Sequence, residues 1–241
     1  MLRPDLWPWG KLMFIGHYSV SFASKKVEPK TPLWATFVGV QFVDILFMIF
    51  ILFGIEGIRF VPGFTEVNNF DLYYMPITHS LVGGIGWSIL CFLIFKFVFL
   101  RSKPYSDSLK NKISGLIGLT VLSHYFLDLP MHTQDLPILF DSGPKIGFGL
   151  WHNRTLSIAT EVTITVIGLA LYFRATKPGP TFGGKYGMQI FGGILLVLAV
   201  ATPFFPPPLT IPEFSIQALV GYILLAWVAG WLDGKRIPVE S

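Results

Sequence analysis

Long apolar runs constrain this chain more than any other feature of its sequence. Six of them lie near the ~20 residues that a helix needs to cross the hydrocarbon core of a bilayer. They cover residues 33–55, 76–100, 113–129, 155–173, 187–205 and 214–232. A weaker, shorter run at 8–24 precedes them, and it either crosses the membrane or is re-entrant.

Only 13% of the residues are charged, whereas a soluble domain carries about 25%. We therefore predict an all-α, polytopic helical membrane protein, with six strong transmembrane helices plus a short N-terminal membrane-embedded helix. Residues 1–241 are expected to form a single integral membrane domain, with 187–232 as an additional C-terminal transmembrane pair. The N-terminal run lacks a convincing small-residue cleavage site, so we expect it to be retained.

The basic residues predict the orientation. Most Lys and Arg residues fall in the segments 25–30, 101–112 and 174–185 and in the C-terminal tail, which share one side if the spans alternate. The positive-inside rule places that side, and the C-terminus, in the cytoplasm, as expected for a bacterial inner membrane protein. The net charge of +4 is spread between the runs, which argues against nucleic-acid binding. The single cysteine, Cys91, excludes a disulfide framework and a thiolate metal site.

Histidines and carboxylates interrupt the apolar runs. A carboxylate in the hydrocarbon costs about 2.5–3.5 kcal/mol, so such residues need partners. His124 and Asp128 share one helix face because they are four residues apart. His79 is expected inside the outer end of the run 76–100, and the polar groups of consecutive spans fall in their outer halves. Imidazoles and carboxylates gathered at one depth are the ligands that divalent metals take.

Simpler interpretations remain open for single residues. A lone intramembrane histidine is more often a hydrogen-bond partner between helices, and Asp44 alone suits a proton or ion path as well as a metal. His152, next to Trp151, is expected at the surface. Pro130 is expected to end its helix, so that His132 and Asp135 turn back over the site.

Four segments together resemble a known family. "FIGHYSVSFASKK", "QFVDIL", "PITHSLVGGIGWS" and "LSHYFLDLPMH" look like successive signatures of the predicted membrane-bound metal-dependent hydrolases, the LexA-regulated inner-membrane group. The order of polar residues is more remotely similar to that of zinc-dependent phospholipases C and S1/P1-type nucleases. The resemblance covers roughly residues 13–161. It implies five metal ligands, with Glu161 serving a second metal: His17, Asp44, His79, His124 and Asp128.

The resulting hypothesis is a hydrolase that binds one or two divalent metals, zinc first with manganese or iron as alternatives, through helices within residues 8–173. His132 is expected as a further ligand, and Asp128, Asp135 or Glu161 as the catalytic base. The substrate would be an ester or phosphoester of a lipid-like amphiphile at the outer half of the membrane. Two alternatives stay open: a non-catalytic subunit that binds partner membrane subunits, and a proton-coupled transporter.

Overall fold

The computed structural model describes residues 15–206 and 208–239. It is 66% helical, with eight α-helices in this part of the chain. The α-helices are α1 (Tyr18–Val27), α2 (Leu33–Val40), α3 (Phe42–Leu52), α4 (Leu81–Ile94), α5 (Asp107–Met131), α6 (Arg154–Ala175), α7 (Met188–Ala201) and α8 (Ile211–Asp233). Short 3-10 or π segments are η2 (Ile15–His17), η3 (Phe95–Phe99), η4 (Leu150–His152), η5 (Gly183–Gly187) and η6 (Thr202–Phe204).

Within residues 15–206 and 208–239, five helices are long and apolar enough to cross a membrane, and they coincide with five of the six predicted spans. They are Leu81–Phe99, Asp107–Met131, Arg154–Ala175, Gly183–Phe204 and Ile211–Asp233. The predicted all-α class is confirmed, with helices suited by length and composition to cross a membrane, while the number of six spans stays a prediction. The remaining run, 33–55, forms α2 and α3, which are bent by 49° where Gln41 leaves the helical conformation.

The N-terminal run 8–24 is described only from Ile15 onward, and its first residues lie outside the described part of the chain. Helix α1 has ten residues and packs against α6. At Gly168 on α6, a Cβ atom would collide with the backbone of Ser19, so the glycine allows the two helices to approach closely.

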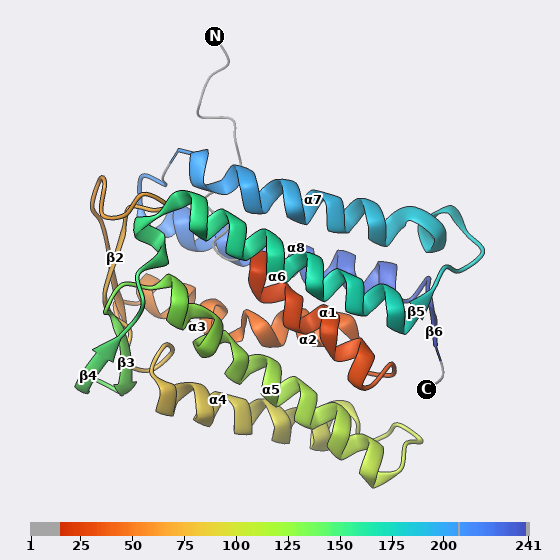
Figure 1. The fold of residues 1–241 in the computed structure, drawn as a ribbon. Helices are drawn as coiled ribbons and strands as arrows, with labels where there is room; N and C mark the ends of the chain where they lie inside the picture. Colours follow the sequence, from red (N-terminus) through yellow and green to blue (C-terminus); the bar gives the residue numbers. More distant parts are fainter. Residues whose placement is uncertain (1–14, 207, 240–241) are drawn as a thin grey trace.

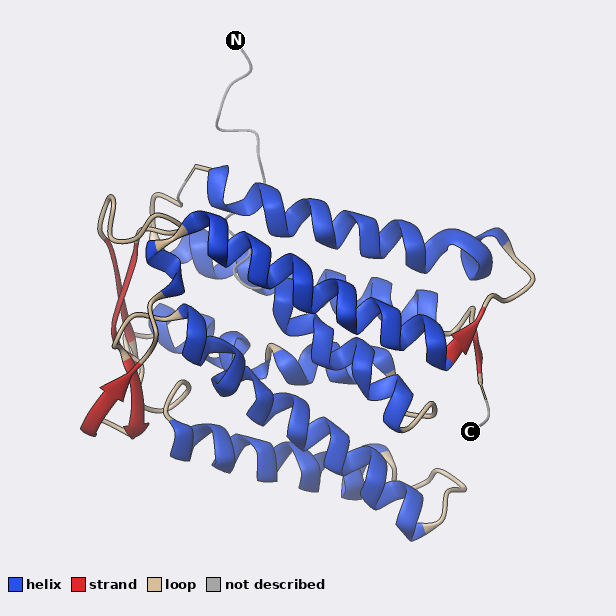
Figure 2. Ribbon diagram, in the orientation of Figure 1, coloured by secondary structure: helices blue, strands red, loops and turns tan. Residues whose placement is uncertain are grey.

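The helices lie side by side, with α1, α2 and α3 between the α4–α5 pair and the side formed by α6, α7 and α8 (Figure 1). Three antiparallel strand pairs occur among the described residues, and the sequence did not predict them. They are β1 (Gly57–Phe60) with β2 (Phe70–Tyr74), β3 (Leu136–Leu139) with β4 (Ser142–Ile146), and β5 (Thr176–Lys177) with β6 (Ile237–Pro238). The first two hairpins lie at one end of the helices and β5–β6 at the other, as Figure 2 shows.

Two helix boundaries differ from expectation, and both affect the polar residues. Helix α4 begins at Leu81, because the Ser80 hydroxyl caps it by accepting the N–H of Gly83 at 3.0 Å. His79 therefore lies in the turn between β2 and α4, and its prediction inside the helix was wrong. Helix α5 continues through Pro130 and ends at Met131, so the proline occupies the last turn instead of ending the helix.

Two clusters of buried apolar side chains flank the polar residues. In one, Trp151 packs with its ring centroid 4.3 Å from that of His132. The other contains Ile15 and Tyr18, which lie within two residues of His17 in the sequence. The histidines thus lie between two apolar cores, where unpartnered charge is costly.

Candidate metal centre

Six buried side chains from separate parts of the chain meet between these cores. They come from η2, α3, the turn before α4, the last two turns of α5, and His132, the residue directly after α5. Asp128 is 0% exposed and His124 is 1% exposed. The six are His17, Asp44, His79, His124, Asp128 and His132.

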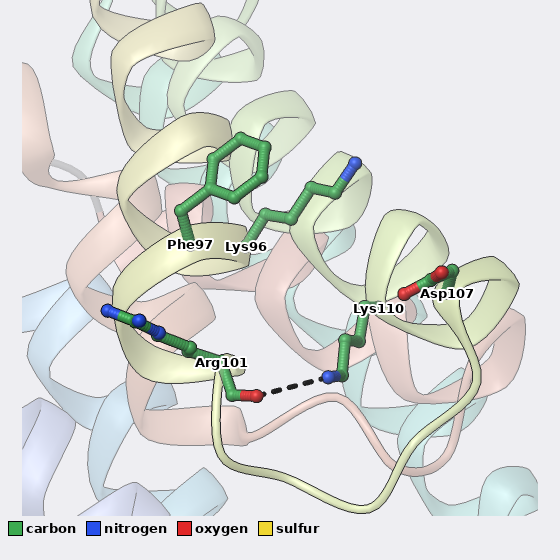
Figure 3. Close-up of a pocket in the computed structure, with 5 residues that line it drawn as sticks. All are labelled: Lys96, Phe97, Arg101, Asp107 and Lys110. Atoms are coloured by element: carbon green, nitrogen blue, oxygen red, sulfur yellow. Dashed lines mark hydrogen bonds between the residues drawn. The ribbon is translucent and has the colours of Figure 1, made fainter.

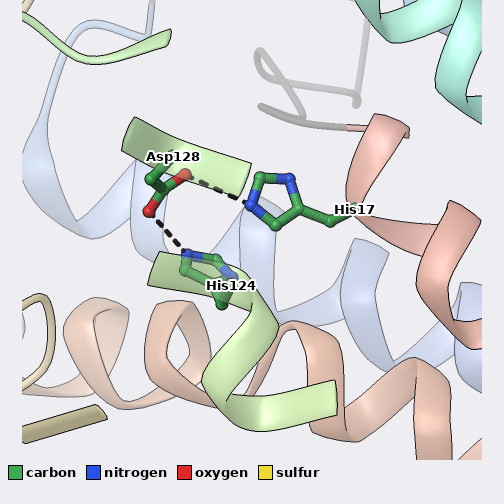
Figure 4. A group of neighbouring side chains, drawn as sticks. All are labelled: His17, His124 and Asp128. Atoms are coloured by element: carbon green, nitrogen blue, oxygen red, sulfur yellow. Dashed lines mark ion pairs between the residues drawn. The ribbon is translucent and has the colours of Figure 1, made fainter. Parts of the chain in front are cut away.

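Asp128 is the hub of the cluster. Its Oδ1 lies 3.2 Å from Nε2 of His17, and its Oδ2 lies 3.1 Å from Nε2 of His124. Figure 4 shows both rings turned toward the carboxylate from different helices. The Nε2 atom of His132 is 3.7 Å from the same Oδ2. The Nε2 atom of His79 lies 3.9 Å from Oδ2. Four imidazoles thus face one carboxylate that has no exposure to solvent.

Asp44 forms a second group that shares His124. Its Oδ1 lies 3.2 Å from Nε2 of His79 and 3.5 Å from Nε2 of His124. Its Oδ2 accepts a hydrogen bond from the hydroxyl of Tyr222 on α8 at 3.2 Å. Within each of the triads His17–His124–Asp128 and Asp44–His79–His124, the ligand atoms lie within 4.8 Å of one another. This spacing suits one or two metal ions.

The outer nitrogen of each of two histidines is held by an acceptor. Nδ1 of His124 lies 2.7 Å from the carbonyl oxygen of Val40, in the turn where α2 ends. Nδ1 of His132 lies 2.9 Å from Oδ1 of Asp135. A carbonyl or carboxylate oxygen carries no proton, so each Nδ1–H must donate. In the neutral ring the Nε2 lone pair then points into the cluster, as a metal ligand requires.

His79 is oriented in the same way through a hydroxyl. Its Nδ1 lies 2.7 Å from Oγ1 of Thr78, and that hydroxyl donates its single proton to Oε2 of the buried Glu56 at 2.6 Å. Nδ1 must therefore donate to Thr78, which leaves its Nε2 as an acceptor. Oε1 of Glu56 also accepts the N–H groups of Ile77 and Thr78. The carboxylate thus holds the whole turn that carries His79.

The supporting roles of Glu56, Thr78 and the carbonyl of Val40 were not predicted from the sequence. Glu56 is a single acid in a loop, and no regular spacing links it to His79; the β1–β2 hairpin brings the two together. The threonine directly before His79 in "PITHS" was the one available signal.

The residues fit a divalent metal. Among the described residues, Nε2 of His124 and both oxygens of Asp128 are buried without a hydrogen-bond partner of acceptable geometry. A neutral His124 therefore directs a lone pair at the lone pairs of two carboxylates, an arrangement that is repulsive unless a cation lies among them. Neutral imidazoles and ionised carboxylates around a dication satisfy every one of these atoms.

The other predicted site residues lie around the cluster. Oε2 of Glu161 accepts the N–H of Gly16 at 3.2 Å, beside His17, and Glu161 belongs to neither triad. Asp135 contacts Nδ1 of His132 and the hydroxyl of Thr133, so it orients the ring of His132. Neither Asp135 nor His132 belongs to a triad. His152 is exposed, in η4.

A small cavity of about 90 Å³ reaches the cluster from the side of α6. Its wall includes His17 and Glu161, together with apolar side chains of α5 and α6. The apolar part consists of Leu127, Pro130, Met131 and Ile164. The partly buried Glu161 and the ring of His17 therefore line the same cavity.

No family model, no curated protein and no solved structure matches this chain. The resemblance to membrane-bound metal-dependent hydrolases therefore stays a prediction based on the motif order.

Proposed function

We propose that this protein is an integral membrane hydrolase that uses a divalent metal to cleave an ester or phosphoester of an amphiphile. The observation that carries the proposal is the orientation of His124: its Nδ1 is tied to Val40, and its Nε2 faces the carboxylates of Asp128 and Asp44. A divalent metal held by such ligands would supply Lewis acidity and would lower the pKa of a water molecule toward 7.

The chain would supply metal ligands and, around them, residues that orient those ligands. His17, His79 and His124 with Asp44 and Asp128 would hold the metal, with His132 as a further ligand beside Asp128. Zinc is the ion we expect first, since it favours nitrogen and oxygen ligands in compact sites. Glu56, Thr78, Val40 and Asp135 fix the rings from outside. Such outer contacts set the tautomer and orientation of a ligand.

The cavity beside His17 is the proposed entry for the reacting group. Its apolar wall suits the acyl side of an amphiphile, and Glu161 is the carboxylate placed to accept a proton there. Because the basic segments predict the cytoplasmic side, we propose that the C-terminus is cytoplasmic and that six spans hold the cluster in the extracytoplasmic half. Helix α1, which leads into the basic segment 25–30, would then end on the cytoplasmic side.

The test uses the purified full-length protein and a panel of lipid phosphoesters and carboxylic esters. We expect turnover that chelation abolishes and a divalent metal restores. Glu161→Gln should lower the rate by about 10²–10⁴-fold, the range for a positioned base, with bound metal retained. Asp141→Asn, an exposed acid in the β3–β4 turn, is the matched control and should leave the rate unchanged. If no member of the panel shows metal-dependent turnover, hydrolysis is wrong.

One observation favours a second function, a structural metal in a subunit of a larger membrane complex. The burial of Asp128 and His124 leaves them no solvent contact, as in metal sites whose ligands are all protein atoms. In that case the protein would have no hydrolase activity, and Glu161→Gln would change no rate. Loss of the metal would instead loosen the helices and release a co-purifying partner.

A further inference from the structure

A second polar site lies at the other end of α5, about 30 Å along the helix from Asp128 at the usual rise per residue. Here the turn between η3 and α5 encloses a pocket of about 330 Å³. Figure 3 shows Lys96 and Phe97 on one helix, Asp107 and Lys110 on the other, and Arg101 in the turn between them. The pocket is far from the metal centre and has no role in the proposed hydrolysis.

Cations outnumber acids around this pocket. Lys96, Arg101 and Lys110 line it against the single carboxylate of Asp107. Within the described part of the chain, none of the three cations forms an ion pair. The Nζ atom of Lys110 donates to the backbone carbonyl of Arg101 at 3.2 Å, which closes one side of the pocket. The site therefore carries an uncompensated positive charge.

Lys96 places part of this charge at the edge of an apolar surface. Its Nζ lies 5.0 Å from the ring centroid of Phe97, which is 58% exposed. A lysine whose stem follows apolar side chains while its ammonium reaches toward polar surroundings is typical of a membrane interface. The five-residue π segment Phe95–Phe99 places Lys96 and Phe97 there, and such π segments are frequent at functional sites.

An exposed apolar stripe leads along α4 to the pocket. Ile85, Ile89 and Leu93 follow one another at four-residue spacing and are 42%, 55% and 42% exposed. Of the five membrane-length helices, Leu81–Phe99 has the least buried apolar window, 17%. This face of α4 is therefore available to acyl chains over several turns, directly next to the cationic pocket.

We propose that this pocket binds the phosphodiester headgroup of an anionic phospholipid, whose acyl chains lie along the Ile85–Ile89–Leu93 face of α4. Cationic side chains at the end of a membrane helix attract anionic headgroups. Lys and Arg supply N–H donors to the phosphate oxygens, and Asp107 weakens the binding by opposing the anion.

The experiment titrates the detergent-solubilised, full-length protein with phosphatidylglycerol, phosphatidylcholine or inorganic phosphate and measures bound ligand by native mass spectrometry. We expect phosphatidylglycerol to bind at least tenfold more tightly than phosphatidylcholine. Each of Lys96→Gln, Arg101→Gln and Lys110→Gln should weaken it about fivefold, since a basic residue near an anionic headgroup contributes about that factor. Asp107→Asn should strengthen it by a similar factor.

Lys103→Gln is the matched control, because Lys103 lies exposed in the same turn and does not line the pocket. It should change binding less than twofold. Equal affinity for phosphatidylcholine, or an equal effect of Lys103→Gln, would overturn the proposal. Competition by inorganic phosphate at the concentrations of the lipid would assign the pocket to a small soluble anion and also overturn it.

Discussion

His124 and Asp128 lie one turn apart on α5, with Nε2 of the ring 3.1 Å from Oδ2 of the carboxylate. The opposite nitrogen of His124 is occupied by the carbonyl of Val40. The ring can therefore offer Asp128 only a lone pair or, if it is protonated, a second N–H. This arrangement suits a bound cation, and the first two predictions follow from that fit.

Replacing His124 should remove most of the bound metal. His124→Ala takes away the one ligand that the two triads share, so both should lose affinity. The loss should exceed the 10–100-fold typical of an outer-shell change. Metal content after desalting, measured by inductively coupled plasma mass spectrometry, checks this. His152→Ala is the control, because that histidine is exposed in η4 and should leave the content unchanged. Equal metal in both variants would remove His124 from the ligand set.

Replacing a residue that orients a ligand ring should lower metal affinity less than replacing the ligand itself. Asp135→Asn and Thr78→Val each release the Nδ1 atom of one histidine, His132 or His79. We expect metal affinity to fall by about 10–100-fold while the site still fills at saturating metal. Competition with a chromogenic chelator measures this. Asp141→Asn, an exposed acid of the neighbouring hairpin, should match the wild type.

A buried ion pair between α1 and α8, at the end of the helices that carries β5 and β6, should contribute strongly to the free energy of unfolding. Nζ of Lys25 on α1 lies 2.8 Å from Oδ2 of Asp233 on α8, and Tyr172 donates to the other oxygen at 2.9 Å. Lys25→Met leaves a largely buried carboxylate without its cation. Such a loss costs about 3–5 kcal/mol.

Unfolding of this variant in detergent, followed by circular dichroism, should show the loss. Lys26→Met changes the exposed neighbour on α1 and should cost far less. Lys25→Met with Asp233→Leu should recover part of the stability, because it removes both charges. Equal stability of the Lys25 and Lys26 variants would mean that the pair contributes little.

The orientation of the chain in the membrane is tested by labelling introduced cysteines on a Cys91→Ala background. Cysteines placed in 101–112 and 174–185 should be protected from an impermeant thiol reagent in intact cells. Cysteines in 135–150 should react. The physical reason is the concentration of Lys and Arg in the first two segments, which disfavours their translocation. The reverse pattern would place the cluster in the cytoplasmic half.

Apolar length alone predicted most of the helices. The runs at 76–100, 113–129, 155–173, 187–205 and 214–232 each correspond to one membrane-length helix. The bend between α2 and α3 was not predicted. Close to it, α2 approaches α5 so tightly that a Cβ at Gly39 would collide with the hydroxyl of Thr120, a contact that only the tertiary fold creates. The start of α4 was missed because apolar residues continue across the Ser80 cap.

The polar residues within the apolar runs predicted the cluster. Burying a polar side chain in an apolar segment is costly, so each of these residues indicated a polar partner elsewhere in the fold. His17 and Asp44 were expected near the His124–Asp128 pair, and the structure brings them together. The roles of Glu161 and Asp135 were less predictable. Glu161 lies against the backbone of Gly16, and Asp135 supports His132, through contacts that only the tertiary fold creates.

The most direct test of the metal centre is the metal content of the wild-type protein, purified without chelator in the full-length form. We predict at least one equivalent of a divalent transition metal per chain, retained through desalting. Chelation should remove it together with part of the thermal stability, since a ligand bound only to the folded state stabilises that state. A protein that holds no stoichiometric metal, even after incubation with zinc, manganese and iron(II), would contradict this account and leave the histidines as hydrogen-bond partners between helices.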